Sequence, residues 1–329
     1  MILAGDIGAT HARLAFFEAV NGRLKLASEA VFLSRQYPGL EEIVAKFLRD
    51  ESEPVDAACF GVAGPVRRGR AEPSNLPWIV ESSRLAQKLN LPSTFLINDL
   101  EANAWGITGL EPADFVALNP GADGAFGNQA VIAAGTGLGE AGIFWDGRRH
   151  RAFACEGGHA DFAPHNDLEI ELLEYLMMKF GRVSCERVLS GPGLLNIYHF
   201  LRDKNPSEEP KWLTEEMAVS DPAAVVSKAA LAGKCPVCQQ ALDLFVSIYG
   251  TEAGNLALKM LATGGVYVAG GIAPKILPKL QTKEFMKAFV DKGRMRPLME
   301  RIPVQVIVNE KAGLLGAARC AAAQLAPKI

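Results

Sequence analysis

Two polar residues, Asn98 and Asp99, follow an apolar run at residues 95–97 that predicts a buried strand. A buried carboxylate is costly unless a partner compensates it. Asp99 has two possible roles. It could cap the following helix, because Asp is a favoured N-cap residue. It could also do chemistry, because ligands of α/β proteins bind at the carboxyl ends of strands. Capping is the favoured role of Asp99 when this stretch is considered alone. A catalytic role therefore needs support from the other polar motifs.

Two further motifs place polar side chains next to or shortly before glycine residues. Glu156 and His159 flank a Gly-Gly pair in EGGH, and Glu186 lies in SCER, just before VLSGPG. Taken singly, Glu186 is typical of a solvated surface and His159 of a structural histidine. A metal site formed by His159, Asp161 and His165 is not favoured, because the residues between them give no regular face.

Two glycine-rich turns, LAGDIGATHAR and IAAGTGLGEAG, each lie between apolar strands. Glycine lets the backbone approach a ligand closely, and successive N–H groups can form an anion-binding nest. One such turn most often makes a hairpin, but two in corresponding places favour binding of nucleotide phosphates. The candidates are Gly5, Asp6, Ile7, Gly8, Ala9 and Thr10 in the first turn, and Gly135, Thr136 and Gly137 in the second.

Other nucleotide motifs narrow this prediction. GxxxxGK[ST] is absent, which excludes a P-loop. A GxGxxG match at residues 137–142 precedes a strand-like run, whereas the dinucleotide motif requires a helix there. Gly270 and Gly271, between a strand and a helix, would let a flat nucleoside lie against the backbone. Asp6 either bonds its own turn or holds Mg²⁺, which uses one or two carboxylates plus substrate phosphates.

Composition limits the class of protein. The chain has 329 residues, 49% of them hydrophobic, and a formal net charge of −3. This length suggests two domains, and no basic block favours nucleic acid or a membrane as a partner. An early Asp6 argues against a signal peptide, so we expect a cytoplasmic protein.

The CxxC at residues 235–238 has no second ligand pair and predicts two structural thiols at a helix start.

The pattern of elements appears twice along the chain. Strands are predicted at residues 2–5, 12–17, 24–32, 55–62 and 94–97, with helices after the third, fourth and fifth. The order recurs with strands at 131–134, 141–145, 150–154, 266–269 and 304–308, and with a helical insertion at 167–231. Such a recurrence predicts an internal duplication, and a ligand cleft between the halves.

The chain resembles the bacterial glucokinases of the hexokinase/actin-like ATPase superfamily nearly from end to end. The resemblance rests on GDIGATHAR, GVAGPV, INDLEA, GTGLG, EGGHADFAP, ERVLSGPG, VAGGI and GLLGAA. It implies an α/β fold of duplicated RNase H-like domains flanking a cleft. The smaller domain would comprise residues 1–107 and 302–329, and the larger one residues 108–301 with helical insertions.

The resemblance also implies a function. The protein would use ATP and Mg²⁺ to phosphorylate the 6-hydroxyl of glucose, at the entry to glycolysis, and would form a homodimer. The implied sugar contacts are Asn98, Asp99, Glu156, His159 and Glu186, with Asp99 as the base. The chemistry of these residues agrees, because carboxylates, an amide and an imidazole all bond hydroxyl groups and a positioned Asp can accept the proton of the nucleophile.

The chain departs from the family pattern GDxGGTNxR at Ala9 and His11, which replace a glycine and an asparagine. An Ala at a positive φ would cost about 1 kcal/mol or more. Cys155 replaces the glycine that precedes EGGH in the family.

Three alternative functions remain open at this stage. The substrate could be another sugar, such as mannose or an N-acetylated hexosamine. A non-catalytic sugar-binding regulator is disfavoured, because the first strand begins at Ile2 and leaves no room for a DNA-binding module before it. An actin-like filament ATPase is disfavoured too, because filament formation does not require the EGGH and SCER motifs.

Overall fold

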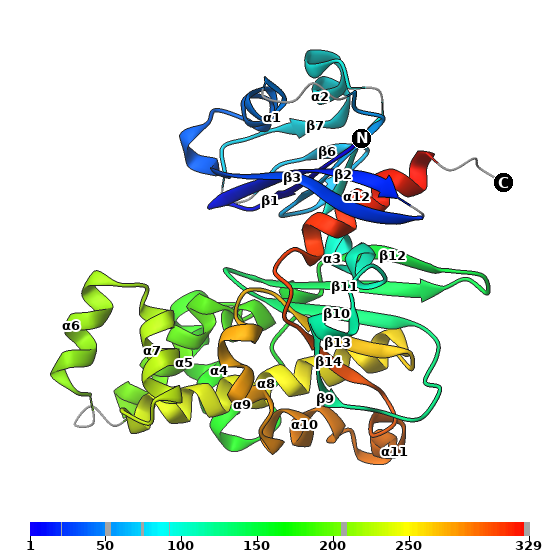
Figure 1. Ribbon diagram of the computed structural model, residues 1–329. Coiled ribbons are helices and arrows are strands. Elements are labelled where there is room, and N and C mark those ends of the chain that lie inside the picture. Colours follow the sequence, from blue (N-terminus) through cyan, green and yellow to red (C-terminus); the bar gives the residue numbers. More distant parts are fainter. Residues whose placement is uncertain (21, 50–53, 74–75, 92, 205–208, 326–329) are drawn as a thin grey trace. The chain divides into compact units, whose positions relative to one another are not determined.

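The computed structural model describes residues 1–20, 22–49, 54–73, 76–91, 93–204 and 209–325. The chain forms two compact units (Figure 1). Unit 1 comprises Met1–Asp114, Ala141–Ala154 and Asn309–Ile329, and unit 2 comprises Phe115–Glu140 and Cys155–Val308. The predicted domain boundaries, after residue 107 and before residue 302, stay a prediction, because compactness does not show which segments fold independently.

The first sheet has the strand order β3-β2-β1-β4-β8. The strands β1, β2 and β3 form an antiparallel meander, while β4 and β8 run parallel to β1. Strands β1 and β4 are buried almost throughout, as central strands of a sheet covered on both faces should be. The bounds are β1 Ile2–Ile7, β2 His11–Val20, β3 Arg23–Leu33, β4 Ala57–Val62 and β8 Thr94–Asn98.

Helices cover both faces of this sheet because successive side chains of a strand point to opposite faces. Leu3 of β1 packs in one core cluster with Leu40 of α1 and Leu85 of α2. Ile2 packs in another with Leu314 of α12. In Figure 1, α1 and α2 lie on one side of the sheet and α12 on the other. The bounds are α1 Leu40–Arg49, α2 Ser82–Leu89, α3 Asp99–Ile107 and α12 Ala312–Leu325.

A small antiparallel sheet was not predicted. It consists of three two-residue strands, β5 Val66–Arg67, β6 Arg70–Ala71 and β7 Val80–Glu81. Strands this short carry no measurable alternation of polar and apolar residues, so they cannot be predicted from periodicity.

The second sheet has the strand order β12-β11-β10-β13-β14-β9. Strands β10, β13 and β14 are parallel, and β9 is antiparallel to β14. The edge strand β9 is half-buried and was not predicted. The bounds are β9 Phe115–Asn119, β10 Gln129–Ala134, β11 Leu138–Trp145, β12 His150–Cys155, β13 Gly265–Ala269 and β14 Val304–Ile307.

The predicted helical insertion is confirmed by four helices, α4 to α7, and the long helix α8 follows them. Residues of α8 such as Phe245 share one core cluster with Ile132 of β10 and Val268 of β13. None of the helices in the described ranges is both long and apolar enough to cross a membrane. The bounds are α4 Asp167–Phe180, α5 Gly191–Lys204, α6 Lys211–Val219, α7 Pro222–Leu231, α8 Pro236–Met260, α9 Leu277–Leu280, α10 Lys283–Val290 and α11 Arg296–Met299.

The CxxC motif lies at the start of α8, as predicted. Cys235 is the N-cap, and its Sγ accepts a hydrogen bond from the N–H of Cys238 at 3.4 Å. Both thiols are buried. Burial raises the pKa of the Cys238 thiol, which makes it a structural rather than a reactive group.

Candidate active site

The predicted turn at Gly135, Thr136 and Gly137 connects β10 to β11 in unit 2. The N–H of Gly135 donates to the carbonyl of Gly137 at 2.8 Å and closes the turn. The carbonyl of Gly135 in turn accepts the N–H of Gly191, the first residue of α5, at 2.8 Å. The turn is therefore fixed both by its own backbone and by the start of a neighbouring helix.

Glu186 holds the other side of this turn. It lies in the 3₁₀ helix η4 (Cys185–Arg187), and its Oε2 accepts the N–H of Leu138, the first residue of β11, at 3.1 Å. A Cβ at position 137 would overlap with the same carboxylate, so a larger residue there would displace the Glu186 side chain. The carboxylate predicted to bind sugar thus directly contacts the backbone of the predicted phosphate turn.

Ser190 explains the sequence VLSGPG. Its Oγ donates to the Glu186 carbonyl at 2.8 Å and accepts the N–H of Gly193 at 2.9 Å. A serine hydroxyl that bonds the first N–H groups of a helix acts as a cap, so Ser190 starts α5 and anchors the segment that carries Glu186.

The EGGH motif forms the 3₁₀ helix η3 (Gly157–His159), directly preceded by Glu156. Its two glycines pack on the start of β11. A Cβ on Gly157 would overlap with the Glu140 carboxylate, and one on Gly158 would overlap with the Leu138 carbonyl. The double glycine is therefore a packing requirement, and it leaves Glu156 and His159 exposed on either side.

Backbone hydrogen bonds connect the EGGH segment to the segment of Glu186. The N–H of Cys185 donates to the Ala160 carbonyl at 2.8 Å, and that of Phe162 to the Val183 carbonyl at 3.0 Å. Arg182 also donates to the His159 carbonyl at 2.7 Å. Unit 2 thus brings together three predicted sugar-binding residues: Glu156, His159 and Glu186.

A cavity of about 490 Å³ adjoins this region in unit 2. Three predicted nucleotide-binding residues line it: Gly135, Thr136 and Gly271. The volume lies within the usual range of small-molecule sites. Most of the remaining wall is apolar and comes from the segments around α5, α7 and the 3₁₀ helix η6 (Ala273–Ile276): Pro192, Leu194, Leu195, Ala223, Ala224, Ile272 and Ile276.

Gly270 and Gly271 differ in their surroundings, and only Gly271 lines this cavity. Gly270 has a φ of +85°, and a Cβ there would lie 2.5 Å from the Ala134 carbonyl oxygen, so the backbone requires glycine. A Cβ on Gly271 would meet no atom within 4 Å. Gly271 therefore leaves open space at the cavity, whereas Gly270 packs against the end of β10.

In unit 1, Asn98 rather than Asp99 is the N-cap of α3, so the prediction that Asp99 caps the helix is wrong. The Oδ1 of Asn98 accepts the N–H groups of Leu100 at 2.8 Å and Glu101 at 3.2 Å. Its Nδ2 donates to the Gly64 carbonyl at 3.1 Å. Asn98 is buried, whereas Asp99 is half-buried and is the first residue of the helix. The burial of Asn98 is thus compensated by three hydrogen bonds.

The first glycine-rich turn is shorter than predicted. Strand β1 extends to Ile7, so Gly5, Asp6 and Ile7 are strand residues and the turn is formed by residues 8–10. Gly8 donates its N–H to the His11 carbonyl at 2.9 Å. The φ of Ala9 is not positive. The cost of an Ala at a positive φ therefore does not arise at Ala9, because this turn does not need the left-handed conformation.

Asp6 and Asp99 lie at the same edge of the first sheet. Ile7 of β1 pairs with Val62 of β4, which pairs with Asn98 of β8. Asp6 and Asp99 are the neighbours of Ile7 and Asn98. Both therefore lie at the carboxyl edge of the parallel strands, where ligands of α/β sheets bind. Burial raises the pKa of the Asp6 carboxyl, and the positive charge of Arg13, its partner across the β1–β2 pair, opposes this.

Sequence reasoning missed Glu140. Its side chain is 1% exposed, and its Oε1 has no hydrogen-bond partner among the described residues. Burial and the Glu252 carboxylate raise the pKa of Glu140 to about 7, against the effect of the Lys259 charge. The sequence does indicate this buried carboxyl group. Glu140 lies two residues after Leu138 in an apolar strand, so the two side chains point to the same face of the sheet.

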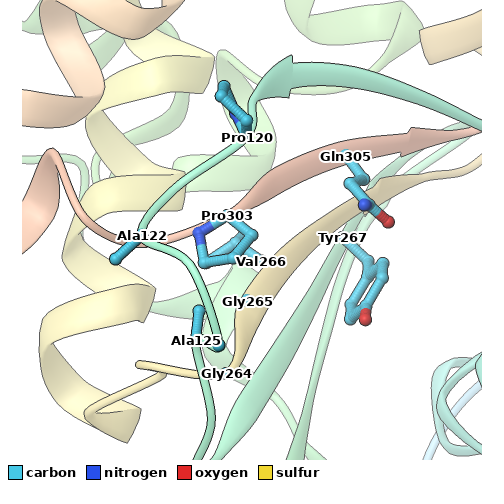
Figure 2. Close-up of a pocket in the computed structure, with 10 residues that line it drawn as sticks. Pro120, Ala122, Ala125, Gly264, Gly265, Val266, Tyr267, Pro303 and Gln305 are labelled. Atoms are coloured by element: carbon cyan, nitrogen blue, oxygen red, sulfur yellow. The ribbon is translucent and has the colours of Figure 1, made fainter.

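A second cavity, of about 280 Å³, lies at the other end of the parallel strands in unit 2. Figure 2 shows Tyr267 and Gln305 beside each other in it, and these two residues are paired in the β13–β14 register. Much of the remaining lining comes from glycine, alanine and proline residues. None of the predicted site residues contributes to it, and ligands of such sheets bind at the opposite, carboxyl edge.

Comparison with known proteins identifies the family. The model of the glucokinase family matches residues 3–324. The glucokinase of Nostoc sp. is 44% identical over 338 residues, which cover 98% of this chain and 99% of the relative. The crystal structure of a glucokinase from an Antarctic psychrotroph has a TM-score of 0.82 at 30% identity and 98% coverage of both chains.

A ROK family glucokinase from Streptomyces griseus, solved in complex with glucose and AMPPNP, has a TM-score of 0.66 at 22% identity. It covers 98% of this chain and 99% of its own. The structural likenesses show a mixed α/β fold of the actin-like ATPase type. Together with the family model and the full-length sequence identity, they establish that this chain belongs to the glucokinase family.

Proposed function

We propose that the protein transfers the γ-phosphoryl group of ATP to the 6-hydroxyl of glucose, giving glucose 6-phosphate and ADP. The observation that carries this proposal is the contact of Glu186 with Leu138. In this contact, a carboxylate that we propose to bind sugar lies against the turn that lines a cavity of nucleotide size. A phosphoryl transfer requires donor and acceptor sites to adjoin in this way.

Five polar residues would bind the sugar: Asn98, Asp99, Glu156, His159 and Glu186. A ring of hydroxyls both donates and accepts hydrogen bonds, and these side chains offer both kinds of partner. A site of this kind rejects analogues that lack a hydroxyl, because its own polar groups are then left unpaired. The exposure of Glu156 and His159 leaves them accessible to a ligand.

Asp99 would act as the general base. It accepts the proton of the 6-hydroxyl while the sugar oxygen bonds to the γ-phosphorus and the bond to ADP breaks. Its place in the first turn of α3 suits this role, because a helix N-terminus favours a negative charge. Because Asn98 caps the helix, the cap would persist when Asp99 takes part in the reaction.

ATP would bind with its nucleoside in the 490 Å³ cavity, between apolar walls and the open side of Gly271. The turn at Gly135 and Thr136 would hold the phosphates. Asp6 would hold Mg²⁺, directly or through water. A cation fits there, because burial disfavours the charged carboxylate and a positive ion would compensate that cost. When bound, Mg²⁺ would neutralise phosphate charge.

The internal duplication is part of the proposal. Its support is the strand order, β3-β2-β1-β4-β8 in the first sheet and β12-β11-β10-β13-β14 in the second, with corresponding parallel pairs. The cleft between the halves stays a prediction. A cytoplasmic homodimer acting at the entry to glycolysis is proposed from the family resemblance alone.

The test is an assay of ADP release by the purified full chain with ATP and Mg²⁺, with and without sugar. Glucose, mannose and N-acetylglucosamine are compared by kcat/KM. We expect sugar-dependent turnover with the highest kcat/KM for glucose. A higher kcat/KM for another sugar would show that glucose is not the preferred substrate. ADP release that does not depend on sugar would contradict the proposed sugar-kinase activity.

A further inference from the structure

A buried carboxyl group lies directly beneath the EGGH segment. Glu140 is 1% exposed, and its carboxylate occupies the space that a side chain on Gly157 would need. Its Oε1 has no hydrogen-bond partner among the described residues. A charged carboxylate without partners is costly in such a place, whereas the protonated form is tolerated.

The charged neighbours of Glu140 come from helix α8. Glu252 is 6% exposed and accepts hydrogen bonds from Asn255 at 2.9 Å and from Lys259 at 3.3 Å. The charge of Glu252 disfavours a second negative charge on Glu140. A proton on Glu140 removes this repulsion.

This cluster contacts both segments that carry sugar-binding candidates. Glu140 lies against Gly157, next to Glu156. The thiol of Cys185, next to Glu186, donates to the Asp161 carbonyl at 3.6 Å. Burial together with the charges of Glu252 and Glu140 raises the pKa of that thiol. A change of charge in the cluster therefore acts on both segments at once.

We propose that Glu140 is a positioning residue for the sugar site: its uncharged carboxyl group supports the EGGH turn in the form that binds glucose. The proposal rests on the proposed function, because it assumes that Glu156 and His159 contact the sugar. Loss of the proton would leave two buried negative charges, on Glu140 and Glu252, that repel each other. The turn would then move, or water would enter, and glucose affinity would fall.

Other titratable groups interact electrostatically with Glu140, and some of them shift its pKa. Lys259, on α8, favours the charged form of Glu140, and Glu252 favours the neutral form. Cys155, Cys185 and Tyr249 also feel the charge of Glu140, but the pKa of each is raised and they stay neutral near pH 7. Glu140 is therefore the group of this cluster that changes charge near neutrality.

The experiment is isothermal titration calorimetry of glucose binding to the full chain without nucleotide, from pH 6 to pH 8. For the wild type, we expect the Kd to rise about tenfold over this range, because a group with a pKa near 7 must stay protonated for binding. The Glu140→Gln variant keeps the shape of the neutral acid, and we expect it to retain the affinity of pH 6 throughout.

Lys259→Met provides a second variant, at a side chain that is 53% exposed. Removal of its positive charge should move the midpoint of the profile to higher pH. The control is Glu169→Gln. Glu169 is equally buried in unit 2 but accepts hydrogen bonds from Asn166 and from the backbone of His165, so its loss should leave the profile unchanged.

The outcomes separate this proposal from the proposed function. A wild-type protein that binds no glucose at either pH would contradict the function itself. If the wild type binds glucose and Glu140→Gln keeps the same pH dependence, the titration belongs to another group and Glu140 has no such role. Equal loss of affinity at every pH in Glu140→Gln would show a purely structural role and also overturn the proposal.

Discussion

Glu186 and Leu138 are joined by a hydrogen bond of 3.1 Å between the Glu186 carboxylate and the Leu138 N–H. Leu138 is the first residue after the turn that lines the nucleotide-sized cavity, and Glu186 is a candidate for sugar binding. One side chain therefore connects the two candidate subsites. A change at Glu186 should alter the binding of both substrates, although only one of them is expected to contact it.

The first prediction concerns Glu186→Ala. It removes the acceptor of the Leu138 N–H, and an unsatisfied buried N–H costs about 1–3 kcal/mol. We expect the KM for ATP to rise about tenfold, together with a larger rise in the KM for glucose, in steady-state assays. Glu186→Gln retains an oxygen acceptor and serves as the matched variant, with an almost unchanged KM for ATP. An unchanged KM for ATP in Glu186→Ala would disprove the connection.

The second prediction concerns the base. Asp99→Asn removes the proton acceptor but keeps the shape of the side chain, so kcat should fall about 10²–10⁴-fold while glucose still binds in calorimetry. Asp167→Asn is the matched control, because Asp167 also begins a helix after an asparagine N-cap, Asn166. The control should turn over normally. Wild-type turnover in Asp99→Asn would refute the role.

Much of this architecture could be predicted from the sequence, because long apolar runs and helical periodicity specify elements independently of their surroundings. Strand β4, for example, is buried at every position, and its apolar run predicted it. The edge strand β9 was missed although its sequence, FVALN, begins with an apolar run. Periodicity alone does not show which kind of element so short a run forms.

The geometry of the candidate site could not be predicted from the sequence. The motif EGGH indicated polar chemistry, yet only the packed structure shows that Gly157 and Gly158 are required by contacts with β11. Likewise, Asn98 and Asp99 are equally good caps by type. Where strand β8 ends decides which of them becomes the cap, and the ends of elements are the least predictable feature of a sequence.

The third prediction separates two adjacent glycines. Gly270→Ala introduces a Cβ at a φ of +85° and 2.5 Å from the Ala134 carbonyl oxygen. The positive φ alone should cost about 1–2 kcal/mol of unfolding free energy in urea titrations, and the close contact should add to it. Gly271→Ala has space and no such φ, so its stability should stay near that of the wild type while its KM for ATP rises. Equal stability of both variants would contradict this assignment.

The fourth prediction concerns the dependence of stability on pH. The pKa of Glu140 is about 7 in the folded protein, against 4.5 for a solvated Glu. The folded state therefore holds the proton more tightly, so the contribution of Glu140 is fully present below pH 4.5 and is lost as the pH rises towards 7. The free energy of unfolding should fall by about 1.4 kcal/mol per pH unit in this window from Glu140 alone.

Glu140→Gln should abolish that slope, so the stability difference between variant and wild type should grow from pH 5 to pH 7 and then level off. Urea titrations of both proteins at each pH measure it, and the contributions of other groups cancel in the difference. A difference that does not change with pH would show that Glu140 does not titrate in this range.

The last prediction concerns Ala9, where the family has a glycine. Because Ala9 does not have a positive φ, glycine would gain nothing in the folded state and would increase the entropy of the unfolded chain. We expect Ala9→Gly to lower the free energy of unfolding by about 0.4–1 kcal/mol.

The contrasting variant is Leu261→Gly. Leu261 has a φ of +47°, ends helix α8 and is 56% exposed. A glycine there relieves a left-handed residue and should raise the free energy of unfolding by about 1 kcal/mol. Stabilisation by Ala9→Gly in the same urea titrations would instead mean that the first turn adopts the left-handed conformation at residue 9.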